Sequence, residues 1–221
     1  VPATVGGAAL GFNWVLLFGA YRYAGVSIAT LVYYCGPMLA LILSPIIFKE
    51  KLKANKIVAV MAVAAGMLFI SGNVTEGSDM QTGLLLGAGA AALYALIIIV
   101  TKRVTHMSGL SCSTYELFIS FIVMIFYLLI NGTRLPVIPS ADDIVYVLII
   151  GFVNTGLAYY MYFSALQKLP AQTSSLISYI EPLTALIVSA LFLGERLGAV
   201  QLLGAALILG GACLGELKLK K

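Results

Sequence analysis

Long apolar stretches, separated by short polar or Gly/Pro-containing breaks, fill almost the whole chain. Because an α-helix needs about 20 residues to cross about 30 Å of hydrocarbon, stretches of this length predict membrane-spanning helices. Ile/Val-rich runs such as 122–130 resemble strands by propensity, but the need to satisfy every backbone group inside lipid favours helices. The eight predicted spans are 4–22, 26–48, 54–71, 81–101, 113–131, 142–165, 171–193 and 198–216.

The composition supports lipid as the solvent. Of 221 residues, 61% are apolar and only 10% are charged, whereas soluble domains are about half apolar and about a quarter charged. So few charges also argue against a nucleic-acid groove. Cys35, Cys112 and Cys213 stand far apart and without metal-ligand spacing, so we expect small apolar side chains and neither a metal site nor a cofactor.

Lys and Arg residues are distributed unevenly between the two sets of loops. Ten belong to one set, and only Arg22, Arg134 and Arg196 belong to the other. Because short cytoplasmic loops are rich in Lys and Arg, the first set is predicted to face the cytoplasm. That set includes a basic tail at 217–221, which places the C-terminus in the cytoplasm of what we expect to be a bacterial inner membrane. The ten residues are Lys49, Lys51, Lys53, Lys56, Lys102, Arg103, Lys168, Lys218, Lys220 and Lys221.

The chain contains an internal repeat. A shift of 145 positions aligns 12–70 with 157–215 without a gap. The two copies begin on opposite faces of the membrane, so the repeat is inverted, which is typical of secondary transporters. The matches at distinctive residues are Tyr34 with Tyr179, Pro37 with Pro182, Ser44 with Ser189, Glu50 with Glu195, Leu52 with Leu197 and Gly66 with Gly211.

The two repeats differ in length. The second, 81–216, holds five predicted helices, whereas the first, 1–73, holds only three. If the symmetry is complete, two helices that precede Val1 are missing, and the complete protein has ten. The sequence therefore predicts an all-α integral membrane protein, an inverted-repeat bundle with eight of its helices in this chain.

The segment 174–214, SSLISYIEPLTALIVSALFLGERLGAVQLLGAALILGGACL, resembles the EamA-type carriers of the drug/metabolite transporter superfamily. Shared features are a Pro-centred helix that ends in (Leu/Phe)-x-Glu-(Arg/Lys)-Leu and a Gly/Ala-rich helix after it. The resemblance implies ten helices, two cytoplasmic termini and export of small metabolites or drugs. The departures are the absent first helices, Gly36 opposite Glu181, and Lys49 opposite Gly194.

Glu181 is the one ionisable residue predicted to lie deep in a span. Ten residues from 171, at about 1.5 Å per residue, bring it to the bilayer midplane. A charge there costs about 2.5–3.5 kcal/mol, so the carboxyl should face a cavity or stay protonated. It could exchange a proton or pair with a cationic substrate. The alternative is a neutral architectural clamp to a neighbouring helix. Ser174 and Ser178 share its helix face, and Pro182 and Pro37 are predicted to kink their helices.

Other polar and aromatic side chains fall at matching depths in several spans. Aromatic walls with an occasional amide suit amphiphilic metabolites or aromatic amino acids. The alternative is an interfacial aromatic belt, which we favour for Tyr21 and Tyr162. The predicted substrate-binding residues are Glu181, Ser178, Tyr34, Asn13, Trp14, Tyr94, Asn154 and Tyr159.

The remaining acidic residues within or beside spans are predicted to be structural. Glu50 and Glu195 end their helices beside basic residues, and Glu116 is expected to snorkel or to pair with Lys102 or Arg103. Small residues at four-residue spacing predict close helix packing, and secondarily a homodimer.

These features predict a secondary transporter that works by alternating access, most consistent with an exporter and compatible with proton coupling. Because no phosphate-binding loop motif occurs, the energy would come from gradients. A non-transporting scaffold is an alternative from another class. A membrane-embedded enzyme needs at least two convergent catalytic groups, which the single deep carboxyl does not supply, so we do not expect an enzyme.

Overall fold

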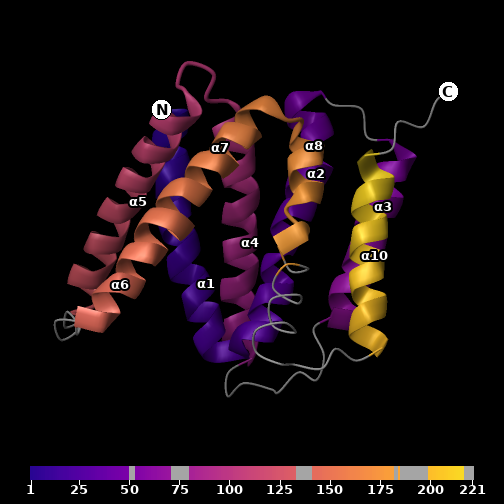
Figure 1. Ribbon diagram of the computed structural model, residues 1–221, viewed down its shortest axis with the longest axis horizontal. Coiled ribbons are helices and arrows are strands. Elements are labelled where there is room, and N and C mark those ends of the chain that lie inside the picture. The colour runs from indigo at the N-terminus through magenta and orange to yellow at the C-terminus, as the bar shows by residue number, and fades with distance from the viewer. Residues whose placement is uncertain (50–52, 71–79, 133–140, 182–183, 185–198, 217–221) are drawn as a thin grey trace.

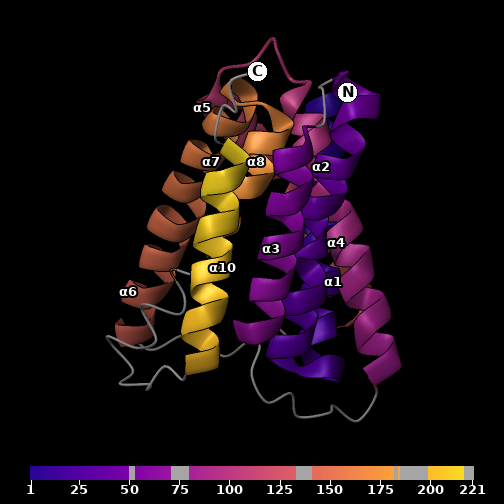
Figure 2. The ribbon, with the colours of Figure 1, turned by 90° about the vertical axis from the view of Figure 1, so that its right-hand side faces the viewer.

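The computed structural model describes residues 1–49, 53–70, 80–132, 141–181, 184 and 199–216, and this part of the chain is all-helical. Its helices stand side by side in one bundle, with the long axes running between the same two ends (Figures 1 and 2). In chain order they are α1 (Pro2–Tyr33), α2 (Cys35–Phe48), α3 (Ala54–Ile70), α4 (Met80–Lys102), α5 (Gly109–Ile130), α6 (Ala141–Ile149), the π-helix η1 (Ile150–Leu157), α7 (Ala158–Lys168), α8 (Ala171–Ile177) and α10 (Ala199–Glu216).

Within the described ranges, four helical stretches are long and apolar enough to cross a membrane: Pro2–Val26, Met80–Lys102, Gly109–Ile130 and Asp143–Lys168. Shorter apolar helices cover Cys35–Phe48, Ala54–Phe69 and Leu202–Gly211. Large apolar side chains remain exposed on most of them, as expected where lipid rather than water surrounds the bundle. The predicted class, an all-helical integral membrane protein, is confirmed.

Two predicted spans are interrupted. Gly25, at φ +77°, separates the first span from the second inside α1. The second span is then broken again at Tyr34, three residues before Pro37, because the proline ring cannot donate to the carbonyl of Tyr33. In the span that begins at 171, α8 ends at Ile177, and Tyr179 bonds back only three residues, to the carbonyl of Leu176. Pro182, to which the second kink was assigned, lies outside the described residues.

The span predicted at 142–165 runs from 141 to 168 and contains an unexpected π-helix. Its wider turn covers Ile150–Leu157, a stretch that includes Gly151 and Gly156, where an added Cβ would meet nothing closer than 3.5 Å. Single-turn π segments inside helices often mark functional sites. The π-helix changes which side chains share a face, so the α-helical spacing of side chains does not hold through this turn.

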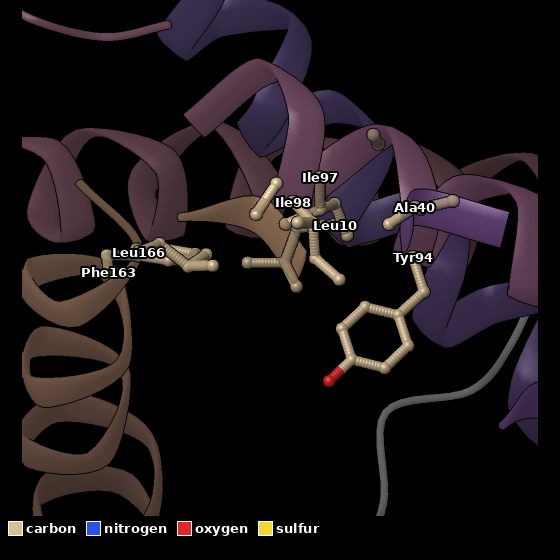
Figure 3. Packing of buried hydrophobic residues seen from close by; sticks show 10 residues of the cluster. Leu10, Ala40, Tyr94, Ile97, Ile98, Phe163 and Leu166 are labelled. Carbon is tan, nitrogen blue, oxygen red and sulfur yellow. The ribbon is translucent and has the colours of Figure 1, made fainter. Parts of the chain in front are cut away.

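The core lies where α1 crosses α4. Small residues bring the two helices together: the Cβ of Ala24 sits against Gly83. A buried apolar cluster that includes Leu10, Ile97, Ile98, Phe163 and Leu166 joins α1, α4 and α7 (Figure 3). This cluster fixes the helices around one side of the cavity described below.

Helices α3 and α10 pack against each other beside this core (Figure 2). A Cβ at Gly66 would lie 2.6 Å from the carbonyl oxygen of Gly204, and one at Gly211 would lie 2.9 Å from that of Ala59. Both glycines therefore allow close backbone approach. Gly211 follows Gly66, and Gly204 follows Ala59, by 145 positions, so the two contacts are reciprocal under the predicted repeat, as in a two-fold interface.

The described basic residues gather at one end of the bundle, where α2 and α4 end and α3 and α5 begin (Figure 1). We call it the lysine-rich end and define it by Lys49, Lys53, Lys56, Lys102, Arg103 and Lys168. Arg22 lies three residues before the break at Gly25 within α1, close to where α4 begins. Alternating helix directions thus bring the basic segments together as the charge pattern predicted. Which end faces the cytoplasm stays a prediction.

Candidate functional site

Two adjoining cavities lie among α1, α4, α7 and α8. The larger has a volume of about 310 Å³ and the smaller about 210 Å³, and both are lined by Tyr94, Tyr162 and Glu181. The other residues of the larger cavity are Leu10, Tyr33, Ile97, Asn154, Ala158 and Tyr159. The smaller is completed by Ala165, Leu166, Leu169, Ser174, Ile177 and Ser178. A small organic molecule fits this combined space.

Tyrosine rings form much of the wall. Tyr33 and Tyr94 stack with ring centroids 5.0 Å apart and planes at 11°. The Tyr162 hydroxyl donates to the Tyr94 hydroxyl at 3.4 Å. Figure 3 shows the Tyr94 hydroxyl pointing away from the aliphatic cluster. The wall therefore offers both ring surface and hydroxyl groups to a bound molecule.

Glu181 follows the break between α8 and the next helical residues. Its carboxyl lies near the Tyr34 hydroxyl. Ser174 and Ser178 line the smaller cavity with it, so the predicted polar stripe is brought together. The Ser178 hydroxyl donates to the Ser174 carbonyl at 3.0 Å, whereas the Ser174 hydroxyl has no hydrogen-bond partner within the described residues.

The π-helix places Asn154 at the cavity. Asn154 lines the larger cavity together with Ala158 and Tyr159, which begin α7. Its side chain is exposed rather than packed against another helix. This segment thus contributes an amide to a wall whose other residues are aromatic and aliphatic except for Glu181.

Trp14 and Tyr159 join α1 to α7 beside the larger cavity. The indole N–H donates to the Tyr159 hydroxyl at 3.2 Å, and the rings meet edge to face with centroids 5.9 Å apart. Tyr159 lines the larger cavity, whereas Trp14 packs against it from outside the lining.

Besides Trp14, two candidates from the first repeat lie outside the cavity lining. Asn13 is buried, and its amide nitrogen donates to the Ala90 carbonyl at 2.7 Å, so it ties α1 to α4. Tyr34 is buried behind Glu181, and Tyr33 lines the larger cavity in its place. Helical spacing from Pro37 favoured Tyr34, but the helix break at Tyr34 alters the direction of both side chains. One feature of the sequence did point to Tyr33: Pro37 has no N–H, so the Tyr33 carbonyl lacks its helical hydrogen bond.

Tyr162 was assigned to the interfacial belt, and this is wrong. It lines both cavities and is hydrogen-bonded to Tyr94. Its position near the predicted span end suggested the interface, but α7 continues to Lys168 and so sets Tyr162 deeper.

The expectation for Glu116 is also wrong. Its side chain is completely buried and neither snorkels nor pairs with Lys102 or Arg103. The carboxyl accepts hydrogen bonds from Thr101 and Cys112. Glu50 and Glu195, the other two acidic residues predicted to be structural, lie outside the described residues.

No group of three His, Cys, Asp or Glu side chains that could hold a metal ion occurs in the described part of the chain. The chemistry of the cavity is therefore that of one carboxyl, several hydroxyls, one amide and aromatic faces.

Known proteins resemble this chain in sequence. The chain is 27% identical over 208 residues to the uncharacterized transporter YxxF of Bacillus subtilis, a match that covers 92% of this chain and 65% of that protein. It is 26% identical to Protein PecM of Dickeya dadantii over 89% of this chain and 66% of that protein.

The chain thus spans about two thirds of the length of these relatives. A crystal structure has the same fold, with a TM-score of 0.85 and 18% identity over 97% of this chain and 75% of that one. The family model described as the EamA-like transporter family matches residues 3–72 and 81–215. The chain belongs to the EamA-like transporter family.

Proposed function

We propose that the protein is a secondary transporter that moves small organic metabolites, amino-acid-like or amphiphilic and drug-like, across the membrane by alternating access. The observation that carries this proposal is a cavity of about 310 Å³ whose lining holds aromatic walls and one carboxyl, that of Glu181. Such a site binds a solute without the paired groups that catalysis needs.

The lining favours a substrate with a positive group. Glu181 is the acidic residue of both cavities, and their described linings contain neither Lys, Arg nor His. A carboxylate within a membrane-spanning segment is costly unless a cation neutralises it. The faces of Tyr33, Tyr94, Tyr159 and Tyr162 also attract cations. An ammonium group therefore binds at Glu181, with the apolar part of the molecule against the rings.

The same carboxyl supplies a coupling device. Glu181 carries either a proton or the substrate cation, so loading one displaces the other, as proton-coupled export requires. The two halves of the chain rock about the cavity, which opens it to one face at a time. The direction of transport is outward, as the resemblance to the EamA-type carriers implies.

An untargeted comparison of metabolites inside and outside cells tests this function. Cells make the full-length protein, its Glu181→Gln variant, or the Tyr146→Phe variant, whose side chain is 66% exposed on α6. The full-length protein and Tyr146→Phe should enrich the same amine-bearing compounds outside the cells, and Glu181→Gln should not. Equal profiles for Glu181→Gln and the unaltered protein would refute the role of the carboxyl. If cells that make the unaltered protein give the same metabolite profile as cells without it, transport is refuted.

A further inference from the structure

A second buried carboxyl lies outside both cavities, between α1, α4 and α5. Glu116 is 0% exposed. The Thr101 hydroxyl lies 3.1 Å from its Oε1 and 3.2 Å from its Oε2, and the Cys112 thiol donates to Oε1 at 3.5 Å. One hydroxyl hydrogen and one thiol hydrogen leave most lone pairs of an ionised carboxylate without a donor.

Among the described residues, no cationic side chain contacts this carboxyl. The elements packed against it present Gly6 and Gly7 from α1 and Thr101 from α4, while α7 presents the Gln167 amide to Cys112. An ionised carboxylate in such surroundings is strongly unfavourable. In this packed arrangement Glu116 therefore carries a proton.

The basic residues that follow Thr101 are directed elsewhere. The Lys102 ammonium donates to the Leu169 carbonyl at 2.9 Å and lies 5.1 Å from the centre of the Phe48 ring. The Arg103 guanidinium lies 5.9 Å from the same ring. These contacts hold both cations at the lysine-rich end, away from the carboxyl.

Helix α1 is seated directly on Glu116. A Cβ added at Gly6 would lie 2.6 Å from the Glu116 Oε1, and one at Gly7 would lie 2.6 Å from its main-chain oxygen. This close packing leaves no room for water at the carboxyl. Hydration of the charged form consequently requires α1 to separate from α5.

The position of Glu116 relates it to access to the cavity from the lysine-rich end. Leu10 and Ile97 line the larger cavity and also belong to the buried apolar cluster. Thr101 lies one helical turn beyond Ile97 on α4, toward the lysine-rich end. Glu116 and its partners thus form a polar layer between the apolar cluster and that end of the bundle.

We propose that Glu116 is a second proton-binding site, distinct from Glu181, whose protonation keeps α1 closed against α4 and α5 at the lysine-rich end. Loss of the proton to water leaves a carboxylate that draws water between α1 and α5, and this end loosens. Because the site is defined by helix packing, the proposal does not depend on the transported substrate.

Cys112 is a built-in reporter of this opening, because its thiol is buried beside the carboxyl. The test uses the full-length protein in detergent, with every other cysteine replaced by serine, and a water-soluble maleimide. Each labelling rate is divided by the rate for the same protein in SDS at the same pH, which removes the intrinsic pH dependence of thiol reactivity. Labelling of the folded protein then measures local opening.

We expect the normalised rate to rise by about tenfold or more between about pH 5.5 and about pH 8.5 with Glu116 present, and to stay flat in Glu116→Gln. Ser113→Ala is the matched control, since the buried Ser113 hydroxyl on the same helix donates only to the Leu110 carbonyl in the described structure; it should keep the rise.

A flat rate with Glu116 present, or an equal rise in Glu116→Gln, would overturn the proposal. If Glu116→Gln does not fold, the pH profiles of the parent protein and Ser113→Ala still decide it. Maleimide labelling does not measure transport. A failure of the proposed function at Glu181 therefore leaves the proposal for Glu116 unaffected.

Discussion

The hydroxyl of Tyr179 donates a hydrogen bond of 2.8 Å to the main-chain carbonyl of Tyr34, and the two residues stand 145 positions apart, the offset at which the chain aligns with itself. Trp14 and Tyr159, also 145 apart, are joined by a second hydrogen bond. Residues related by a two-fold rotation touch each other only where they lie near its axis. Both pairs border the cavity region, so the proposed axis of the inverted repeat passes beside the site.

The Tyr179–Tyr34 bond should contribute measurably to stability. Tyr179→Phe leaves a buried carbonyl without its donor, which costs about 1–3 kcal/mol. We expect Tyr179→Phe to lower the melting temperature of the full-length protein in detergent. Size-exclusion chromatography after heating measures the melting temperature. Tyr146→Phe, at an exposed position, should leave the melting temperature unchanged. Equal melting of both variants would show that the bond does not hold the halves together.

Gly66 and Gly211 should be equally intolerant of a side chain. Each Gly→Ala change drives a methyl group against the backbone of the opposite helix, which costs about 1–3 kcal/mol. Gly210→Ala is the control, since a Cβ there meets nothing within 4 Å. It should be neutral, or stabilising by up to about 1 kcal/mol. Thermal melting that does not separate Gly211→Ala from Gly210→Ala would contradict the close packing of α3 and α10.

Asn13 and Asn154 should behave differently although sequence analysis treated them alike. Asn13→Ala removes the donor to the buried Ala90 carbonyl and should lower the free energy of unfolding by about 1–3 kcal/mol. Asn154→Ala, at the cavity wall, should stay within about 0.5 kcal/mol of the parent protein while changing the exported metabolites. Denaturation in detergent measures the free energy of unfolding, and the metabolite comparison measures the change in export. A loss of stability in Asn154→Ala with none in Asn13→Ala would contradict these two roles.

Much of the fold was predictable because lipid imposes simple rules. Span length and loop charge indicated the helices and their alternating directions, and a deep carboxyl pointed to Glu181. Ser174 and Ser178 followed from helical spacing, which holds along α8. These inferences need only local regularity.

The errors occur where local regularity ends. The break at Tyr34 brings Tyr33 rather than the predicted Tyr34 to the cavity wall. The π-helix before Tyr159 was not detectable from a period of 3.6 residues. Glu116 was misplaced because its surroundings are set by α1, more than a hundred residues earlier. Tertiary packing of this kind leaves no signal in the spacing of a single helix.

The most direct test of the central claim, that Glu181 binds either a proton or a substrate cation, is proton release on binding. Phenyltrimethylammonium, a permanently charged ring compound, is added to the full-length protein in weakly buffered detergent solution, and a pH indicator follows the proton.

A bound cation displaces the proton from the carboxyl, so affinity should increase as pH rises. Glu181→Gln should show neither proton release nor this pH dependence, and Glu116→Gln should retain both. Equal proton release in Glu181→Gln and the parent protein, or no binding by the parent protein at any pH, would contradict the account.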